Sequence, residues 1–224
     1  MTLFFADLLP YSTELLAALW ISVYITVVTM IAGGALGVLL YLGKASKVGV
    51  IKAPSAAYIE IFRNTPVLVQ LYLIYFALPA IGMNLGPTWS AVIALTLNNA
   101  AYTAEIYRAG FESVPQGLRE AGSALGMRQD QVFRHVVFLP AIHNVLPALT
   151  NQLILLFLAS SIASIIALPE LMHEMLDISS MTFRTVEVLI VGGLLYFGVS
   201  SLLAIGSKLV EAKAFKWAVV KHNV

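Results

Sequence analysis

The chain is interrupted by one long polar stretch, which reads EIYRAGFESVPQGLREAGSALG over residues 105–126 and continues as MRQDQVFRHVVFLP to residue 140. Very apolar sequence lies on both sides of it. The stretch is rich in Arg and Glu and in residues that favour helices. A polar helical segment of this length inside an apolar chain predicts a loop that lies in water and contacts another protein.

The composition places most of the chain in a lipid bilayer. Of its 224 residues, 59% are hydrophobic and only 11% are charged, and the mean hydropathy is +0.87. Soluble domains carry about a quarter charged residues, so much of the apolar surface must face lipid. The N-terminus lacks the basic segment of a cleavable signal peptide, and we expect the first apolar run to be retained. The absence of Cys excludes disulfides, thiolate metal sites and a Cys nucleophile.

Five apolar stretches are long enough to cross a membrane, which takes about 20 mostly apolar residues. We therefore predict an all-α integral membrane protein with five transmembrane helices in one domain over residues 1–224. The expected spans are residues 15–43, 56–82, 88–107, 140–168 and 186–207, with a polar loop at about 112–138.

The charges predict the orientation of these spans. Lys and Arg gather on one side, at Lys44, Lys47, Lys52, Arg108, Arg119, Arg128, Arg134, Lys208, Lys213, Lys216 and Lys221. The opposite loops hold Asp7, Glu14, Glu170, Glu174 and Asp177, with Arg184 as their only cation. The positive-inside rule then places the N-terminus outside and the C-terminus in the cytoplasm.

Small and polar residues inside the spans predict how the helices meet. Gly33 and Gly37 form a small face that lets helices approach closely, and packing within the subunit is favoured over a dimer seam. Amides at membrane depth face either a neighbouring helix or a wet cavity, because lipid cannot satisfy them. Both interpretations are open for Asn98, Asn99, Asn151 and Gln152.

The polar loop is expected to form two short helices in an L. Ser113 is a candidate cap, Pro115 suits the first turn, Gln116 suits a capping box and Gly126 suits the stop. One helical face would carry Val114, Leu118, Ala121 and Leu125. A second apolar set, Val132, Phe133, Val136 and Val137, would precede Pro140 at the start of the fourth span. On these residues alone, a solvated helix pair packed on the bundle is an equal alternative to a docking element.

The loop resembles the EAA loop of bacterial ABC-importer permeases. Glu120, Ala121 and Gly126 match that pattern, and Gly122 replaces its second Ala. Leu139-Pro140 comes one residue later than the pattern, which indicates an insertion around residues 137–138. The resemblance implies that this helix docks on a separate ATPase, and it marks as coupling residues Ser113, Pro115, Glu120, Ala121, Gly122, Gly126 and Pro140.

Three further blocks resemble the permeases for polar amino acids, the group that includes importers of histidine, glutamine, arginine and glutamate. They are YIEIFRNTPVLVQ at residues 58–70, NNAAYTAEIYRAG at residues 98–110, and LPALTNQ at residues 146–152 followed by LPEL at residues 168–171. With the loop they cover most of the chain in order. The resemblance implies a central pathway, for which the nominated residues are Asn98, Tyr102, Gln152, Phe157 and Ser160.

The charged residues near the spans are expected to form structural ion pairs. Glu60 with Arg63, and Glu105 with Arg108, stand three residues apart on helices, where side chains meet. One departure from the family concerns LLFLASS at residues 155–161, where relatives commonly show Lys-Asp-Thr-Ser. Without that Lys, either a partner permease supplies the substrate pocket or specificity rests on the binding protein. The first alternative is favoured.

Other chemistries lack their signals in this sequence. No phosphate-binding Gly-x4-Gly-Lys-Ser/Thr loop occurs, so ATP and Mg²⁺ are expected on a partner, with no cofactor or catalytic residue in this chain. The His residues at 135, 143, 173 and 222 show no paired metal spacing. The alternative function is a self-contained secondary transporter or channel subunit, which would show inverted repeats or ionisable residues inside the spans. It is disfavoured, because the sequence shows no convincing repeat and the span interiors are nearly uncharged.

The resemblance therefore implies a membrane permease subunit of an ATP-driven importer for a polar amino acid or related solute, in the bacterial inner membrane. Its expected partners are a cytoplasmic ATPase homodimer, a second permease, an extracytoplasmic solute-binding protein near residues 170–184, and membrane lipid. A heterodimer of permeases is favoured over a homodimer. No nucleic acid is expected.

Overall fold

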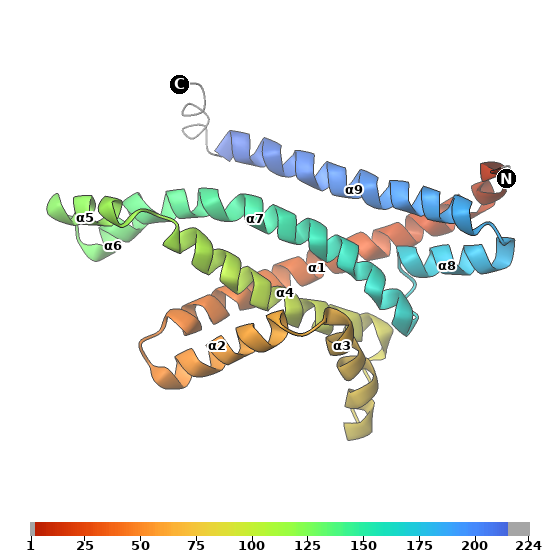
Figure 1. The fold of residues 1–224 in the computed structure, drawn as a ribbon, viewed down its shortest axis with the longest axis horizontal. Helices are drawn as coiled ribbons and strands as arrows, with labels where there is room; N and C mark the ends of the chain where they lie inside the picture. Colours follow the sequence, from red (N-terminus) through yellow and green to blue (C-terminus); the bar gives the residue numbers. More distant parts are fainter. Residues whose placement is uncertain (1–2, 215–224) are drawn as a thin grey trace.

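The computed structural model describes residues 3–214, and within them all regular structure is helical (Figure 1). The α-helices are α1 (Ser12–Ala45), α2 (Gly49–Arg63), α3 (Val67–Tyr72), α4 (Gly86–Glu112), α5 (Gln116–Ala124), α6 (Gln129–Gln131), α7 (Phe138–Ala159), α8 (Leu171–Thr182) and α9 (Thr185–Ala214). Three 3-10 helices join them, at Phe5–Tyr11, Leu78–Ile81 and Ser160–Ile166. Two π-helical turns lie at Leu73–Ala77 and Val132–Val137. Lys216, Lys221 and His222 lie outside the described residues.

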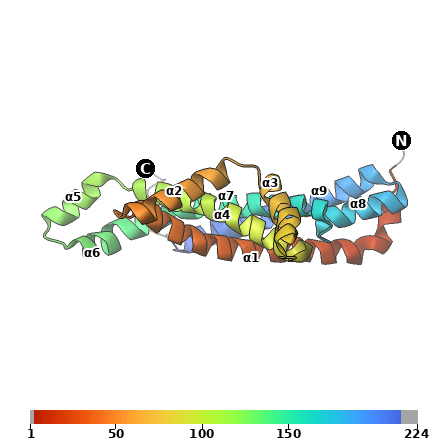
Figure 2. The same ribbon diagram turned by 90° about the horizontal axis from the view of Figure 1, so that it is seen from below.

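The bundle is long and flat, and the α5–α6 loop and the N-terminal helix lie at its opposite ends (Figures 1 and 2). The C-terminal end of α9 points toward the α5–α6 end of the bundle (Figure 1). By length and composition, three helical segments can cross a membrane: Phe5–Ala45, Gln129–Ile166 and Thr185–Lys213. A fourth crossing is formed if the bent pair Gly49–Arg63 and Val67–Ile81 acts as one span.

The central helix α4, expected as a span at residues 88–107, is not among these apolar segments. It is 27 residues long, but it carries Asn98, Asn99, Thr103 and Glu105 among its apolar residues. The reason lies in its position: α4 packs against α1, α2, α3 and α7, and much of its surface is buried. A helix enclosed by other helices does not need the hydropathy of one that faces lipid.

The contact between α1 and α4 depends on two glycines of α1. A Cβ at position 37 would lie 2.1 Å from Thr103 Oγ1, and one at position 33 would lie 2.6 Å from Asn99 Nδ2. Thr103 uses the close approach, because its hydroxyl donates to the Gly33 carbonyl at 3.1 Å. The small face of the first span therefore packs within the subunit, as predicted.

The second expected span, residues 56–82, is broken rather than continuous. Helix α2 ends at Arg63, α3 begins at Val67, and the two are bent by 105° at the Asn64–Pro66 link. The α3 segment projects from the bundle as an arm (Figure 1). Pro66 has no backbone N–H and precedes the first turn of α3, which explains why a break falls there.

Two amides hold the break in place. Gln70 Nε2 donates to Thr65 Oγ1 at 2.7 Å and to the Phe62 carbonyl at 3.0 Å. Asn98 Nδ2, from α4, donates to Gln70 Oε1 at 3.1 Å and also to the Phe62 carbonyl at 3.3 Å. These bonds satisfy carbonyls that the broken helix would otherwise leave unpaired in an apolar environment. Asn98 therefore has a structural role at the bend.

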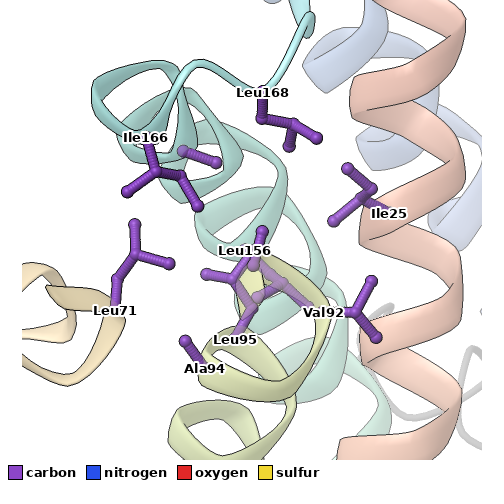
Figure 3. Packing of buried hydrophobic residues seen from close by; sticks show 10 residues of the cluster. Ile25, Leu71, Val92, Ala94, Leu95, Leu156, Ile166 and Leu168 are labelled. Carbon is purple, nitrogen blue, oxygen red and sulfur yellow. The ribbon is translucent and has the colours of Figure 1, made fainter. Parts of the chain in front are cut away.

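The largest apolar cluster lies where α1, α3, α4 and α7 meet, and its side chains point toward one another (Figure 3). Its buried members include Ile25, Leu71, Val92, Leu95, Leu156 and Ile166. A second cluster near the N-terminal end holds α8 and α9 on α1, and a third lies beneath the α5–α6 loop. These clusters fix the helices on which the polar groups described below are placed.

We predict that Gly37→Ala destabilises the subunit, because its new methyl group meets the Thr103 side chain and lies 3.0 Å from the Ala104 backbone nitrogen. Overpacking of this kind costs about 1–3 kcal/mol. Thermal unfolding of the purified protein in detergent would show a lower Tm than the wild type.

Gly193→Ala is the matched control, since nothing lies within 4 Å of the added methyl group on α9. Its Tm should equal that of the wild type or exceed it slightly. Equal Tm values for Gly37→Ala and Gly193→Ala would contradict the tight contact between α1 and α4.

Candidate functional site

The α5–α6 loop ends its first helix as the sequence predicts. Gly126 has φ +77°, a left-handed conformation that glycine adopts without steric cost. Its N–H bonds the Ser123 carbonyl at 3.0 Å, and the Met127 N–H bonds the Gly122 carbonyl at 3.2 Å. This pair of bonds is the Schellman arrangement, which satisfies the last carbonyls of a helix.

The start of α5 differs from the prediction. Ser113 does not cap α5; it ends α4, and its hydroxyl donates to the Gly110 carbonyl at 2.7 Å. Pro115 precedes the first helical residue, Gln116, whose side chain bonds Glu120 at 2.9 Å instead of forming a capping box. The turn between the helices is anchored by Val114, which is buried in the cluster beneath the loop. Burial of Val114 thus sets where α5 begins.

The apolar face expected to pack on the bundle is instead turned outward. Leu118 is 45% exposed and Leu125 is 82% exposed. Gly122 is the buried residue of α5, and a Cβ there would lie 3.1 Å from Val132 Cγ2. The helix therefore rests on the chain below through a glycine and presents leucines to its surroundings. Leu118 and Leu125 therefore do not pack beneath α5 as expected, and outward apolar residues indicate a contact surface.

The second half of the loop is continuous with the fourth span. The π-helical turn Val132–Val137 continues directly into α7, with Pro140 in the first turn of that helix. A π turn accommodates one extra residue in a helix, which accounts for the insertion inferred from the sequence. The wider turn also relieves the clash between a proline ring and the carbonyl four residues earlier. The part of the loop from Gln129 onward and α7 therefore form one connected rod.

An aromatic series joins this rod to the other helices. Tyr41 of α1 stacks on Phe111 of α4 with ring centroids 5.6 Å apart, and Phe111 stacks on Phe133 of the π turn at 5.8 Å. Phe138 of α7 contacts Phe111 and Phe133 at 6.3 and 6.2 Å. The packed rings therefore connect the loop to α1, α4 and α7 through continuous contacts.

A cluster of charges lies one turn from the loop. Glu105 accepts a hydrogen bond from Lys44 Nζ at 3.2 Å and from Arg108 Nε at 2.7 Å. Arg108 also pairs with Glu112. The Glu105–Arg108 pair expected from the sequence is thus present, and it has a third member from α1.

The expected pair of Glu60 with Arg63 is not formed among the described residues. Glu60 accepts instead from Asn64 Nδ2 at 3.3 Å. Arg63 lies at the last position of α2, and its guanidinium is directed to Glu105 at 3.9 Å and to the Tyr102 ring at 5.7 Å. The break after Arg63 leaves its side chain facing α4 rather than its own helix.

A cleft of about 480 Å³ opens beside this charge cluster, between α2, α4 and α7. Its polar lining consists of Arg63, Tyr102, Glu105, Ser113, Asn144, Asn151 and Gln152. Two nominated pathway residues, Tyr102 and Gln152, therefore lie together here. Asn98, Phe157 and Ser160 lie outside the cleft: Asn98 holds the bend, while Phe157 and Ser160 are fully buried.

Of the other polar residues of α7 in the cleft, Asn151 was left open between a helix contact and a wet cavity, and Asn144 was not singled out from the sequence. One face of α7 carries Asn144, Ala148 and Asn151, which recur at intervals of four and three residues. Across the cleft from that face lie Ile106 and Ala109 of α4. This spacing in the sequence could have indicated that these residues share one helical face. Gln152 is fixed beside them, because its Nε2 donates to Asn99 Oδ1 at 3.0 Å and Asn99 in turn donates to the Thr29 carbonyl.

The opposite end of the bundle is held by two charged residues. Glu170 is fully buried and accepts hydrogen bonds from Ser22 at 3.2 Å, Tyr196 at 3.1 Å and the His173 N–H at 2.9 Å. Burial raises the pKa of the Glu170 carboxyl above its ordinary value. Arg184 pairs with Asp7 and so fastens the N-terminal helix to the start of α9.

Together these features describe a helical membrane subunit with an apolar contact loop at one end and a polar cleft beside it. Residues 30–216 match the family of binding-protein-dependent transport system inner membrane components. The match spans most of the chain, and the protein belongs to that family. Members are permeases of ABC transporters, which work with a separate ATPase.

Named relatives narrow this class. The chain is 36% identical over 214 residues to the arginine transport system permease protein ArtQ of Bacillus subtilis (strain 168), covering 95% of this chain and 98% of the relative. It is 36% identical over 199 residues to the octopine transport system permease protein OccM of Rhizobium radiobacter, covering 85% and 81%. These relatives and the fold make it a permease component of the amino-acid ABC transporter type.

Solved structures agree on the fold. A chain in the crystal structure of an amino acid ABC transporter with histidines superposes with a TM-score of 0.90 at 35% identity, covering 95% of this chain and 100% of that one. The MetNI methionine ABC transporter in an inward-facing conformation gives a TM-score of 0.71 at 22% identity, covering 92% and 98%. The second likeness shows the fold alone.

We predict that Gly126→Ala loosens the loop, because an L-residue in the left-handed region costs about 1–2 kcal/mol. Amide hydrogen exchange at residues 116–128 should become about five- to thirtyfold faster. Gly117→Ala is the matched control on the same helix, where the added methyl group meets nothing within 4 Å and helix propensity improves. Exchange in Gly117→Ala should be unchanged or slower, and wild-type exchange in Gly126→Ala would contradict the Schellman stop.

Proposed function

We propose that this chain is the permease subunit of an ATP-driven importer for a polar amino acid, and that it forms half of the translocation pathway. The observation that carries the proposal is the α5–α6 loop, which turns Leu118 and Leu125 outward beside the family-marked Glu120. A recess of about 720 Å³ borders this surface and is lined by Pro115, Gln116, Arg119 and Glu120. Such a surface suits a protein partner that is apolar at its centre and polar at its rim.

The proposed topology has five crossings in a single domain over residues 1–224: α1, the bent α2–α3 pair, α4, α7 and α9. Its support is the enclosed position of α4 and the gathering of Lys44, Arg108, Arg119 and Arg134 near the α5–α6 end. That end is then cytoplasmic, the N-terminus is outside, and the loop at about 112–138 is the EAA loop. The membrane is the bacterial inner membrane.

The proposed partners follow from this topology. Two copies of a cytoplasmic ATPase bind the loops, and they hold the ATP and Mg²⁺, since this sequence has no phosphate-binding loop of its own. A second permease completes the pathway. An extracytoplasmic solute-binding protein docks on the outer end near Glu170 and Arg184, where the N-terminal helix, α8 and α9 meet.

A cleft within this subunit bears on the choice between a heterodimer and a homodimer. The missing Lys-Asp pair at residues 155–161 favoured a partner that supplies the only pocket. The cleft lined by Tyr102, Asn151 and Gln152 instead supports a pocket in this subunit. That removes the reason for preferring a heterodimer, and two identical permeases serve the proposal equally well.

The geometry suggests how ATP drives transport. Closure of the ATPases moves α5, and Gly122 passes the movement to Val132 in the π turn. From there, α7 moves as part of the same rod, and the stacked rings of Phe111 and Phe133 carry α4 with it. The cleft lies between α4 and α7, so its shape changes with the loop.

We predict that Leu125→Ser reduces ATPase association by about tenfold or more, since burying a leucine contributes about 1.5–3 kcal/mol. The measurement is affinity purification of the tagged permease in mild detergent, with quantitative mass spectrometry of its partners. An ATPase and a permease recovered at fixed ratios with the wild type would support the importer.

Val50→Ser is the matched control. Val50 is 85% exposed, close to the 82% of Leu125, and it begins α2 away from the loop. ATPase recovery with Val50→Ser should equal that of the wild type. Full recovery with Leu125→Ser, or purification of the wild-type chain alone in several detergents, would contradict the docking role.

A further inference from the structure

We propose that Arg63 binds the carboxylate of the transported amino acid in the cleft between α2, α4 and α7, an inference that rests on the proposed function. Neither the EAA loop nor the nominated pathway residues assign a partner to that carboxylate. The structure supplies one at a place where the sequence predicted only a structural ion pair.

The charges beside the cleft do not balance. Lys44, Arg63 and Arg108 all approach Glu105. Arg108 has a second carboxylate in Glu112. Three cations therefore share two carboxylates, and the two closest contacts to Glu105 belong to Lys44 and Arg108. One positive charge is left without a carboxylate of its own, and it belongs to Arg63.

The Arg63 guanidinium lacks a hydrogen-bonded carboxylate. Its nearest carboxylate oxygen, Glu105 Oε1, lies 3.9 Å from Nη1, too far for a hydrogen bond. Its Nε is buried and has no hydrogen-bond partner. The Tyr102 ring, 5.7 Å from the guanidinium carbon, steadies the cation without using its donors. The two terminal Nη groups of the guanidinium make no hydrogen bond in the part of the chain that the structure describes and stay available for a planar, bidentate carboxylate.

The rest of the cleft suits an amino acid in its size and in its polar groups. Its volume of about 480 Å³ falls in the range of small-molecule sites, about 300–1,000 Å³. Asn151 makes no hydrogen bond within residues 3–214, and Gln152 uses only its Nε2. The amide oxygens of these two residues are therefore open to an ammonium group. An amino acid carries both a carboxylate and an ammonium, and the cleft offers a partner for each.

This assignment also accounts for the sequence departure at residues 155–161. A cation for the substrate carboxylate does not have to come from the fourth span, because the end of α2 brings one to the same cavity. The 105° bend is what makes this possible, since a continuous second span would not end at Arg63. Arg63 is then a specificity-determining residue for substrates that carry a carboxylate.

The test uses the complete detergent-solubilised importer, with its ATPase and without the binding protein. Equilibrium binding of L-arginine, L-histidine and L-glutamine, and of the α-carboxamide of each, is measured by titration calorimetry. We expect at least one amino acid to bind the wild type, and its amide to bind about tenfold or more weakly, because a hydrogen-bonded charge is lost. This comparison needs no variant.

Variants then place the effect on Arg63. Arg63→Gln should weaken binding of the amino acid about tenfold or more while leaving its amide unchanged, and Arg63→Lys should lie between Arg63→Gln and the wild type. Lys52→Gln is the matched control, because it removes an exposed cation from α2 that does not line the cleft. Its binding should equal that of the wild type.

Two results would overturn the assignment: equal binding of amino acid and amide to the wild type, or wild-type affinity in Arg63→Gln. Absence of binding to the wild type, in a complex that imports one of these amino acids once its binding protein is added, would overturn it as well. The proposed function fails separately, if reconstituted vesicles with ATP and binding protein import no amino acid at all.

Discussion

The structure depends on a polar helix being held in the middle of an apolar bundle. Lipid offers no hydrogen bonds, so each amide or charge on α4 needs a partner from another helix. Asn98 bonds Gln70 on α3, Asn99 bonds α1 and α7, Thr103 bonds α1, and Glu105 pairs with Lys44 at the end of α1. These contacts fix the positions of four helices relative to one another. The cleft lies between helices held in this arrangement, and Gln152, which lines it, is fixed by its bond to Asn99.

Much of the fold could be predicted from hydropathy, and the rest could not for identifiable reasons. Expected spans at residues 15–43, 140–168 and 186–207 correspond to long apolar helical segments, the second of which ends at Ile166, because lipid-facing helices need apolar residues along their length. The bend at Pro66 is braced by Gln70 of α3 and by Asn98 of α4, and the sequence does not show that α4 brings Asn98 beside this bend. The outward face of α5 was predicted to point inward, since the rule that apolar faces pack inside assumes a protein without partners. The second half of the loop was expected to precede a fourth span that opens at Pro140, whereas a π turn joins the two into one continuous helix.

The candidate site was harder to predict than the fold. Tyr102 and Gln152 could be nominated because the resemblance to amino-acid permeases implies a central pathway along the third and fourth spans. Arg63 was placed in an ion pair with Glu60 because the two stand three residues apart, and its position at the end of α2 was not visible without the bend. Each π turn lies just before a proline, Pro79 or Pro140. These irregular turns therefore follow from the local sequence, although they affect the direction of whole helices.

The outward Leu125 has a consequence for the life of the subunit before assembly. A leucine that is 82% exposed on a loop in water is an attractive site for chaperones and proteases while no ATPase covers it. On the proposed function, a permease made in excess of its ATPase would carry this uncovered patch into the cytoplasm and be removed. The same side chain that docks the motor would then also set the ratio in which the subunits accumulate.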